Sequence, residues 1–302
     1  MAESGRMSIE STDVLPPIRP VSGFRIRVAA EQDQPAVCAL SAAAFSLDIS
    51  DATAAERWRV RVAHAFTTDP EGTFLAELDG GVIGVAQAIR RERLWCLATL
   101  AVAGDVQSGG VGRALLGHAL GYGADADVRF LLSSRDPRAL RLYGLAGFAL
   151  RPTFDAAGEL DRAALPAGDA RVRDAGEADI ETLAAISREQ RGAPHTLELR
   201  YALARGWRLL RLDDRGFAVA DAGHSVWLLV ARDEDAAAAL LWAAIEAVGE
   251  TGDSVIRWIT GEQQWAIAVA LRAGLRLGPS GALGVRGEAG ALRCFLPNGA
   301  FA

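Results

Sequence analysis

The chain has 302 residues, half of them hydrophobic, which is enough for two domains that each bury a core. Charged residues make up 23% and the formal net charge is −6, which argues against a nucleic-acid-binding surface spread over the whole protein. The three cysteines and four histidines are scattered without metal-ligand spacing, which indicates reduced cytoplasmic thiols and no bound metal.

Residues 1–23 are predicted to form a flexible N-terminal tail. The first twenty are polar, include three prolines and contain no apolar run long enough for a signal peptide or a membrane span. We therefore expect a cytoplasmic protein with no membrane partner.

One order of elements is predicted twice along the chain. Phe24–Asp33 and Ala170–Asp179 have similar sequences, and each is typical of a short strand followed by an acidic helix start. The strands that follow are predicted at Thr73–Leu78, Val82–Ile89, Leu94–Val102 and Val128–Ser133, and again at Trp207–Leu212, Phe217–Asp221, Ser225–Val230 and Val255–Thr260. A helix precedes the last strand of each set, at Val111–Tyr122 and at Ala236–Val248.

The repeat predicts two related domains. We expect them at residues 24–155 and 170–302, with residues 156–169 as a linker, because that stretch is rich in Ala, Gly and Asp and lacks clear periodicity.

The segment after the strand Leu94–Val102 carries the strongest chemical signal. It is a loop with three glycines that leads into the helix at Val111. Backbone N–H groups at a helix start have no intrahelical partners, and the helix dipole adds positive potential there. Glycines let a phosphate approach the backbone, so the junction is suited to a diphosphate.

This loop, Gln107-Ser-Gly-Gly-Val-Gly112, resembles the Q/R-x-x-G-x-G signature of the GNAT superfamily of acetyl-CoA-dependent N-acetyltransferases. It follows Leu100-Ala-Val102 at the end of a strand, and it precedes Ala139–Phe148, which is similar to the family's A-x-x-L-Y-x-x-x-G-F element. The resemblance implies an α/β (α+β) fold of two tandem GNAT-like domains. Each would be a mixed, mostly antiparallel twisted sheet flanked by helices.

The resemblance also implies a mechanism and a set of site residues. Strands Leu94–Val102 and Val128–Ser133 would splay apart to hold the pantetheine arm, with backbone groups of the first strand polarising the thioester. Tyr143 would protonate the leaving thiolate, unless it only fills space between helix and sheet. The residues implied for acetyl-CoA are Leu100, Ala101, Val102, Gln107, Ser108, Gly109, Gly110, Val111, Gly112, Arg113 and Asp136.

The second half lacks these features. Its corresponding loop carries Asp233, Glu234 and Asp235 in place of glycines, and Ala270 stands where Tyr143 stands. Three carboxylates would repel a diphosphate but are good helix caps. We expect this half to be structural and to share in the substrate pocket, with one or two of its five tryptophans in a cleft. The C-terminal run Ala291–Ala302 is a candidate to cross over and complete the first sheet.

The acceptor and the base stay open at this level. Glu56, Glu77 and Glu92 are candidate bases, and a water chain is an alternative. We expect a small-molecule primary amine as acceptor, in a monomer or homodimer. The other possibilities are a longer acyl group such as succinyl, which an arginine facing the acyl pocket (Arg90, Arg91 or Arg93) would favour, a non-catalytic acyl-CoA sensor, and a structural protein with both sites dead.

Overall fold

A computed structural model describes residues 21–221, 225–247, 254–299 and 301 of the chain. The first half has the strand and helix order that the sequence predicts, with β4 and α3 at the predicted bounds. Its elements are β1 (Arg25–Val28), α1 (Gln34–Ala44), α2 (Ala52–Thr68), β2 (Thr73–Leu78), β3 (Gly81–Arg91), β4 (Leu94–Val102), α3 (Val111–Tyr122), β5 (Val128–Ser134), α4 (Pro137–Leu145) and β6 (Ala149–Gly158).

The second half repeats this order. Its elements are β7 (Val172–Asp174), α5 (Ile180–Arg191), α6 (Thr196–Ala204), β8 (Arg208–Leu212), β9 (Gly216–Ala220), β10 (Ser225–Ala231), α7 (Glu234–Glu246), β11 (Ser254–Thr260), α8 (Gln264–Arg272), β12 (Arg276–Gly287) and β13 (Phe295–Leu296). Helix α7 begins two residues before its predicted start because the Asp233 carboxylate accepts a hydrogen bond from the Ala236 N–H and caps the helix. Its predicted end at Val248 lies outside the described residues.

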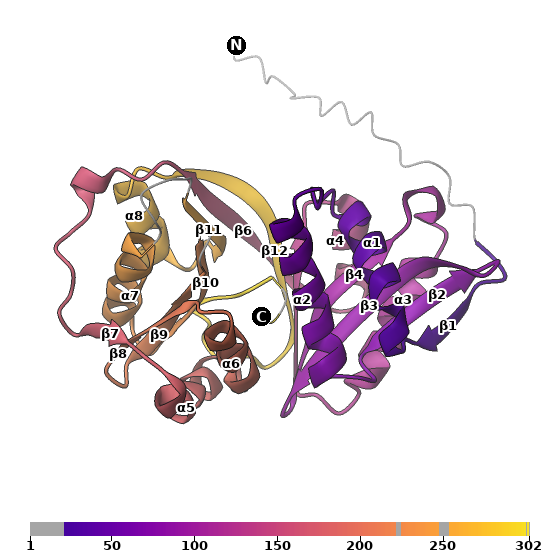
Figure 1. Cartoon of the computed structure of the whole chain (residues 1–302), viewed down its shortest axis with the longest axis horizontal. Coiled ribbons are helices and arrows are strands. Elements are labelled where there is room, and N and C mark those ends of the chain that lie inside the picture. Colours follow the sequence, from indigo (N-terminus) through magenta and orange to yellow (C-terminus); the bar gives the residue numbers. More distant parts are fainter. Residues whose placement is uncertain (1–20, 222–224, 248–253, 300, 302) are drawn as a thin grey trace, which may run out of the picture.

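The two halves share one sheet, because each half gives a strand to the other (Figure 1). Among the described residues the strand order is β1-β2-β3-β4-β5-β12-β6-β11-β10-β9-β8-β7, and β13 pairs with β10. Strand β12 from the second half thus lies between β5 and β6 of the first half, and β6 lies between β12 and β11. Most neighbours are antiparallel, and β4–β5 and β10–β11 are the parallel pairs of this path.

The crossing strand is β12 and not the C-terminal run. Strand β12 pairs with β5 from Gly281 to Gly287, whereas Phe295 and Leu296 pair with β10 in their own half. The expectation that residues 291–302 complete the first sheet is therefore wrong. Strand β6 continues to Gly158, so the sheet passes without a break through the expected domain boundary at residue 155, and the division into domains stays a prediction.

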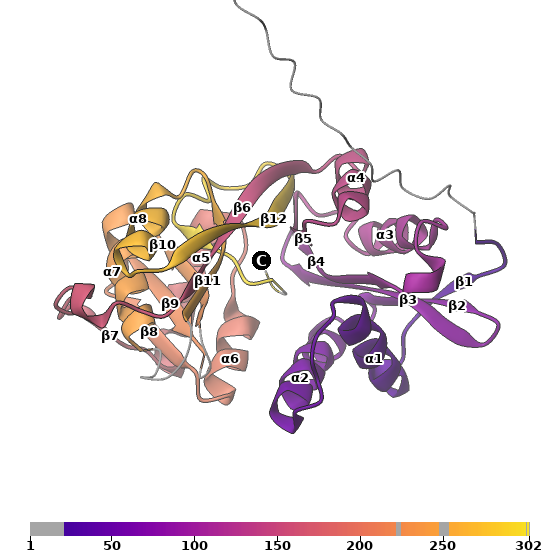
Figure 2. The same ribbon diagram turned by 90° about the horizontal axis from the view of Figure 1, so that it is seen from above.

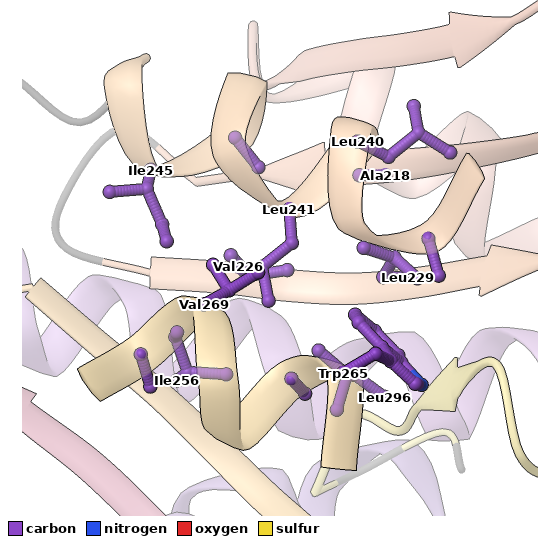
Figure 3. Packing of buried hydrophobic residues seen from close by; sticks show 14 of the residues in the cluster. Ala218, Val226, Leu229, Leu240, Leu241, Ile245, Ile256, Trp265, Val269 and Leu296 are labelled. Atoms are coloured by element: carbon purple, nitrogen blue, oxygen red, sulfur yellow. The ribbon is translucent and has the colours of Figure 1, made fainter. Parts of the chain in front are cut away.

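Helices cover both faces of the sheet in each half (Figure 2). In the first half, α3 and α4 pack on one face around Leu115, Leu116 and Tyr143, and α1 and α2 pack on the other around Val37 and Val62. In the second half, α7 and α8 cover one face with a core rich in Ala and Leu, which Figure 3 shows around Leu241 and Val269.

A third core joins the halves. It contains first-half residues such as Ile89 and Phe130 together with second-half residues such as Leu199 and Phe217. At its edge the buried Arg91 of β3 donates hydrogen bonds to Asp69 (2.9 Å) and, across the junction, to Glu198 of α6 (2.7 Å). Shared strands, apolar packing and a buried ion pair therefore fix the halves relative to each other.

We predict that Gly281→Ala destabilises the protein by loosening the strand exchange. A Cβ on Gly281 would lie 1.8 Å from the carbonyl oxygen of Ser133 on β5, whereas a Cβ on Gly278 of the same strand meets nothing within 4 Å. Overpacking of this kind costs about 1–3 kcal/mol. Gly278→Ala is the matched control, because both changes remove the same backbone freedom from the unfolded chain. Equal free energies of unfolding in urea for the two variants would contradict the prediction.

Candidate functional site

Strands β4 and β5 separate in the middle of the sheet. Their parallel pairing runs from Leu94–Val128 to Leu97–Leu131 and ends there, although β4 continues to Val102 and β5 to Ser134. Beyond Leu97, β4 is paired with β3 alone, so its other edge faces a gap. The predicted splay of the two strands is confirmed, and backbone groups on this edge of β4 are available to a ligand.

The N-terminus of α3 lies beside this gap. Helix α3 begins after Gly110, and the first helical hydrogen bond is donated by the Ala114 N–H to the Gly110 carbonyl. Among the described residues, the N–H groups of residues 110–113 have no backbone acceptor. Four adjacent donors at the positive end of a helix dipole form a site suited to an anion such as a diphosphate.

The loop before α3 is held in place by two hydrogen bonds. The Gln107 side-chain amide donates to the Val102 carbonyl at 3.1 Å, and the Val21 N–H donates to the Gly109 carbonyl at 3.0 Å. A Cβ on Gly109 would lie 2.3 Å from the Val21 side chain, so this glycine makes room for the N-terminal segment. Gly110 has a φ of +91° and open space around it, so it alone among the loop glycines needs left-handed backbone freedom.

Three further predicted loop residues differ in what they offer a ligand. The Val111 side chain is buried in the core, so only its backbone N–H is available to a ligand. Arg113 is exposed on the first turn of α3. A Cβ on Gly112 would lie 3.5 Å from the Val102 side chain, which is an ordinary van der Waals distance. An alanine therefore fits at this position.

A cavity of about 1030 Å³ lies where this gap meets the second half. The predicted residues that it brings together are Leu100, Ala101, Val102, Gln107, Asp136 and Tyr143. Its walls do not include residues 108–113, which lie outside the cavity beyond Gln107. The other walls come from the α1–α2 region, around Trp58 and Arg61, and from the second half, around Tyr201 and Trp227. One space therefore joins the open edge of β4 to residues from both halves.

Tyr143 points into this cavity from α4, and it is 5% exposed. Its ring packs edge-on against Phe148, with 6.4 Å between centroids. Burial, with a smaller effect of the Asp136 charge, raises the pKa of the Tyr143 phenol, so the hydroxyl keeps its proton at neutral pH. Asp136 caps α4 by accepting from the Arg138 N–H and pairs with the Arg138 guanidinium at 2.8 Å, which offsets the charge that Asp adds near the site.

The second half contributes aromatic side chains to the cavity. Three of its tryptophans, Trp207, Trp227 and Trp258, line the wall. Trp258 sits at a bulge of β11 with a φ of +63°, and its N–H donates to the Asp155 carboxylate at 3.0 Å. A bulge re-aims a side chain, so strained backbone here accompanies a tryptophan in the cavity wall.

The corresponding gap of the second half is filled by its own C-terminal segment. Pairing between β10 and β11 ends at Val226–Ile256, and β13 then pairs with β10 through Leu296–Leu229 and Phe295–Val230. The buried Gln263 side chain donates to the Leu292 carbonyl and holds the segment in place. Among its described residues, this half therefore has no glycine loop before α7, and the edge of β10 at this gap is paired with β13.

None of the three candidate bases lines the cavity. Glu77 pairs with Arg25 and Arg27, Glu56 with Arg59, and Glu92 with Arg188. The carboxylates in the cavity wall are Asp48, Asp136 and Asp221. Asp221 directly follows the strand β9, and neither its spacing nor its context marks it in the sequence.

The three arginines that we considered for an acyl pocket do not line the cavity. Arg90 pairs with Asp125, Arg91 with Asp69 and Glu198, and Arg93 with Asp127. The cavity instead contains Arg57, Arg61, Arg205 and Arg257. Helical spacing places Arg61 on the same side of α2 as Trp58, but only the fold shows that this side faces β4.

Two broader features of the described residues concern metals and membranes. No group of three or more His, Cys, Asp or Glu side chains there is arranged to hold a metal ion. No helix in those residues has both the length and the apolar character needed to cross a bilayer.

Comparison with known proteins finds a family model that matches part of the chain. Residues 36–148 match the model of the acetyltransferase (GNAT) family. No curated protein matches the sequence.

Solved structures share the fold over nearly the whole chain. A putative acetyltransferase from Pyrococcus horikoshii matches with a TM-score of 0.77 and 18% identity, over 93% of this chain and 97% of that one. A GCN5-related N-acetyltransferase from Sphaerobacter thermophilus matches at 0.56 and 19%, over 89% and 96%. A tandem GNAT protein from the clavulanic acid biosynthesis pathway, solved without AcCoA, matches at 0.59 and 15%, over 87% and 98%.

The burial of Tyr143 predicts an alkaline titration. The chain has three tyrosines and no lysine, and the pKa of each phenol is raised, first of all by burial and for Tyr122 to about 12. An unfolded phenol loses its proton near a pKa of about 10, so between that value and the higher folded pKa the free energy of unfolding falls as pH rises.

Tyr143→Phe should lessen this alkaline loss of stability by about 1 kcal/mol near pH 11. It should leave the tyrosinate absorbance of the folded protein at that pH unchanged. A folded-state absorbance that drops in the variant would show that Tyr143 titrates as an exposed phenol.

Proposed function

We propose that the chain is an N-acetyltransferase, because residues 36–148 match the model of the acetyltransferase (GNAT) family. It would move the acetyl group of acetyl-CoA to a primary amine of a small molecule by direct attack in a ternary complex. The observation that carries the proposal is that the open edge of β4 and Tyr143 line one cavity, whose wall ends at Gln107 in the loop that leads to the N-terminus of α3.

The proposed cofactor positions follow from the donors that the fold leaves unpaired. The diphosphate of acetyl-CoA would bind the N–H groups of residues 110–113, with Arg113 as an added charge. The pantetheine arm would lie in the gap along Leu100–Val102, where β4 has no partner strand. Gln107 would act indirectly, because its amide holds the loop against Val102.

The proposed reaction forms one bond and breaks one. The neutral amine attacks the thioester carbonyl, a C–N bond forms, and the C–S bond breaks. Tyr143 donates its proton to the leaving thiolate, a role that a phenol with a raised pKa performs from its protonated state. With Glu56, Glu77 and Glu92 all outside the cavity, we propose that water takes the proton from the ammonium group.

The second half, in this proposal, closes the acceptor site and binds no acetyl-CoA of its own. Its carboxylate-rich helix start and its filled strand gap support one cofactor site per chain. A cavity enclosed from two sides suits a small molecule better than an extended peptide. The free thiols Cys38, Cys96 and Cys294 fit the reducing cytoplasm where we expect the enzyme to act.

We predict that Gly110→Asp prevents acetyl-CoA binding and that Gly110→Asn largely retains it. Both side chains tolerate a left-handed backbone, so the pair differs in charge alone next to the diphosphate site. Gly117→Asp, on an exposed part of the same helix, controls for a new charge on α3. Isothermal titration with acetyl-CoA should give one site per chain in the wild type. Unchanged affinity in Gly110→Asp would remove the diphosphate from this loop, and two sites per chain would show that the second half also binds.

We predict that Tyr143→Phe lowers kcat by about 10²-fold, the usual range for one proton donor, with acetyl-CoA affinity changed by less than about 3-fold. The ring and its contact with Phe148 remain in the variant, so folding is preserved. An unchanged kcat would leave Tyr143 as a packing residue. Binding of acetyl-CoA without turnover of any amine in the wild type would favour a sensor over an enzyme.

A further inference from the structure

The charged groups of the cavity are not all neutralised. Asp136 pairs with Arg138, and Arg257 pairs with Asp155 at 3.3 Å. Arg61 and Arg205 have no carboxylate within salt-bridge distance among the described residues, although both line the cavity. A guanidinium that is partly removed from water and lacks an anion is a strong binding group for one.

Arg61 is fixed next to the expected reaction centre. Its guanidinium donates to the Ala98 carbonyl at 2.9 Å and toward the Thr99 hydroxyl at 3.4 Å, in the part of β4 that follows its last pair with β5. It stacks on the Trp58 ring, 4.4 Å from the ring centroid. Burial lowers the pKa of Arg61 to about 10, which still leaves it charged at neutral pH.

Arg205 approaches the cavity from the second half. Its guanidinium lies over the rings of Tyr201 (5.3 Å) and Trp207 (5.6 Å), and its Nε is buried without a hydrogen-bond partner among the described residues. The Arg205 charge acts on the Glu56 carboxylate, but Glu56 already forms an ion pair with Arg59. A buried N–H without an acceptor is costly unless a ligand supplies one.

The two arginines line the same cavity, Arg61 from the first half and Arg205 from the second. Tyr201 lines it too, beneath the Arg205 guanidinium. Burial raises the pKa of the Tyr201 phenol, and the charges of Arg205 and Arg61 both oppose that rise. Aromatic side chains complete the surroundings, with Trp207 and Trp227 packed against Tyr201. The combination suits a ligand that has an anionic group and an apolar body.

We propose that Arg61 and Arg205 bind a carboxylate of the acceptor next to the expected thioester position. The acceptor is then an amine that also carries a carboxylate. Arg205 and its aromatic neighbours lie in the second half, opposite the β4 edge, which favours the acceptor over the acyl chain as the source of this group. The inference rests on the proposed function and names the substrate class of the same cavity.

The test uses amine pairs that differ only in the carboxylate. L-Phenylalanine and L-phenylalaninamide serve as acceptors with acetyl-CoA, and a second arm compares succinyl-CoA with acetyl-CoA on the amide. In the wild type we expect the free acid to react with a kcat/KM at least 10-fold above that of the amide. Arg205→Met should lower kcat/KM for the acid by about 10–100-fold and for the amide by less than 3-fold, with Arg61→Met acting in the same direction.

Arg200→Met is the matched control, because Arg200 is exposed on α6, pairs with Glu177 and does not line the cavity. It should leave both rates unchanged. A preference for succinyl-CoA that Arg61→Met abolishes would keep the carboxylate site but assign it to the acyl chain. Equal use of acid and amide, and of both donors, would overturn the proposal.

A binding measurement separates this inference from the proposed function. Phenylalanine should quench the fluorescence of the cavity tryptophans in the wild type and bind at least 10-fold more weakly to Arg205→Met, whether or not acetyl-CoA binds. Acetyl-CoA binding that is intact in a protein without carboxylate preference would overturn the inference alone. Carboxylate binding in a protein with no affinity for acetyl-CoA would overturn the proposed function and leave the site in place.

Discussion

The exchange of β6 and β12 holds the two halves together and thereby shapes the cavity between them. Each half reaches a complete sheet only with a strand from the other, and the close approach of Gly281 to Ser133 shows how tightly the exchanged strand fits. Strands that pair across the junction cannot separate without breaking backbone hydrogen bonds. The apolar core and the Arg91–Glu198 contact add to this, so the cavity between the halves has a defined shape.

The gap between the two parallel strands is open in the first half and filled in the second. In the first half, β4 and β5 part after Leu97 and leave a strand edge open to the cavity. In the second half, the equivalent gap after Val226 is filled by β13 and the residues around it. A strand edge whose hydrogen bonds are satisfied by the chain itself has no free groups for a ligand. The degenerate loop and the filled gap therefore support a single cofactor site from independent observations.

The arginines of the cavity differ from most other arginines of the protein in what they contact. Most of the arginines that the structure pairs with carboxylates lie outside the cavity, as Arg90 and Arg93 do, where such pairs add little to stability. Within the cavity, Arg61 instead bonds to the backbone of β4 and Arg205 to aromatic rings. Groups held in this manner are pre-organised for an anion, since no internal ion pair has to break when one binds.

Local sequence patterns were enough to predict the order of elements and the first-half residues of the candidate site. Hydrophobic periodicity and glycine placement predicted β4, α3 and the order of elements in both halves, and the Gln107–Gly112 motif located the loop, because local spacing records these features. Contacts between distant parts of the chain determine which strands are exchanged, that β13 fills a gap in its own half, and which arginines face the cavity. Arg61 and Arg93 look alike in sequence. Long-range packing places one beside β4 and the other beside Asp127, and no local pattern specifies contacts between residues that far apart.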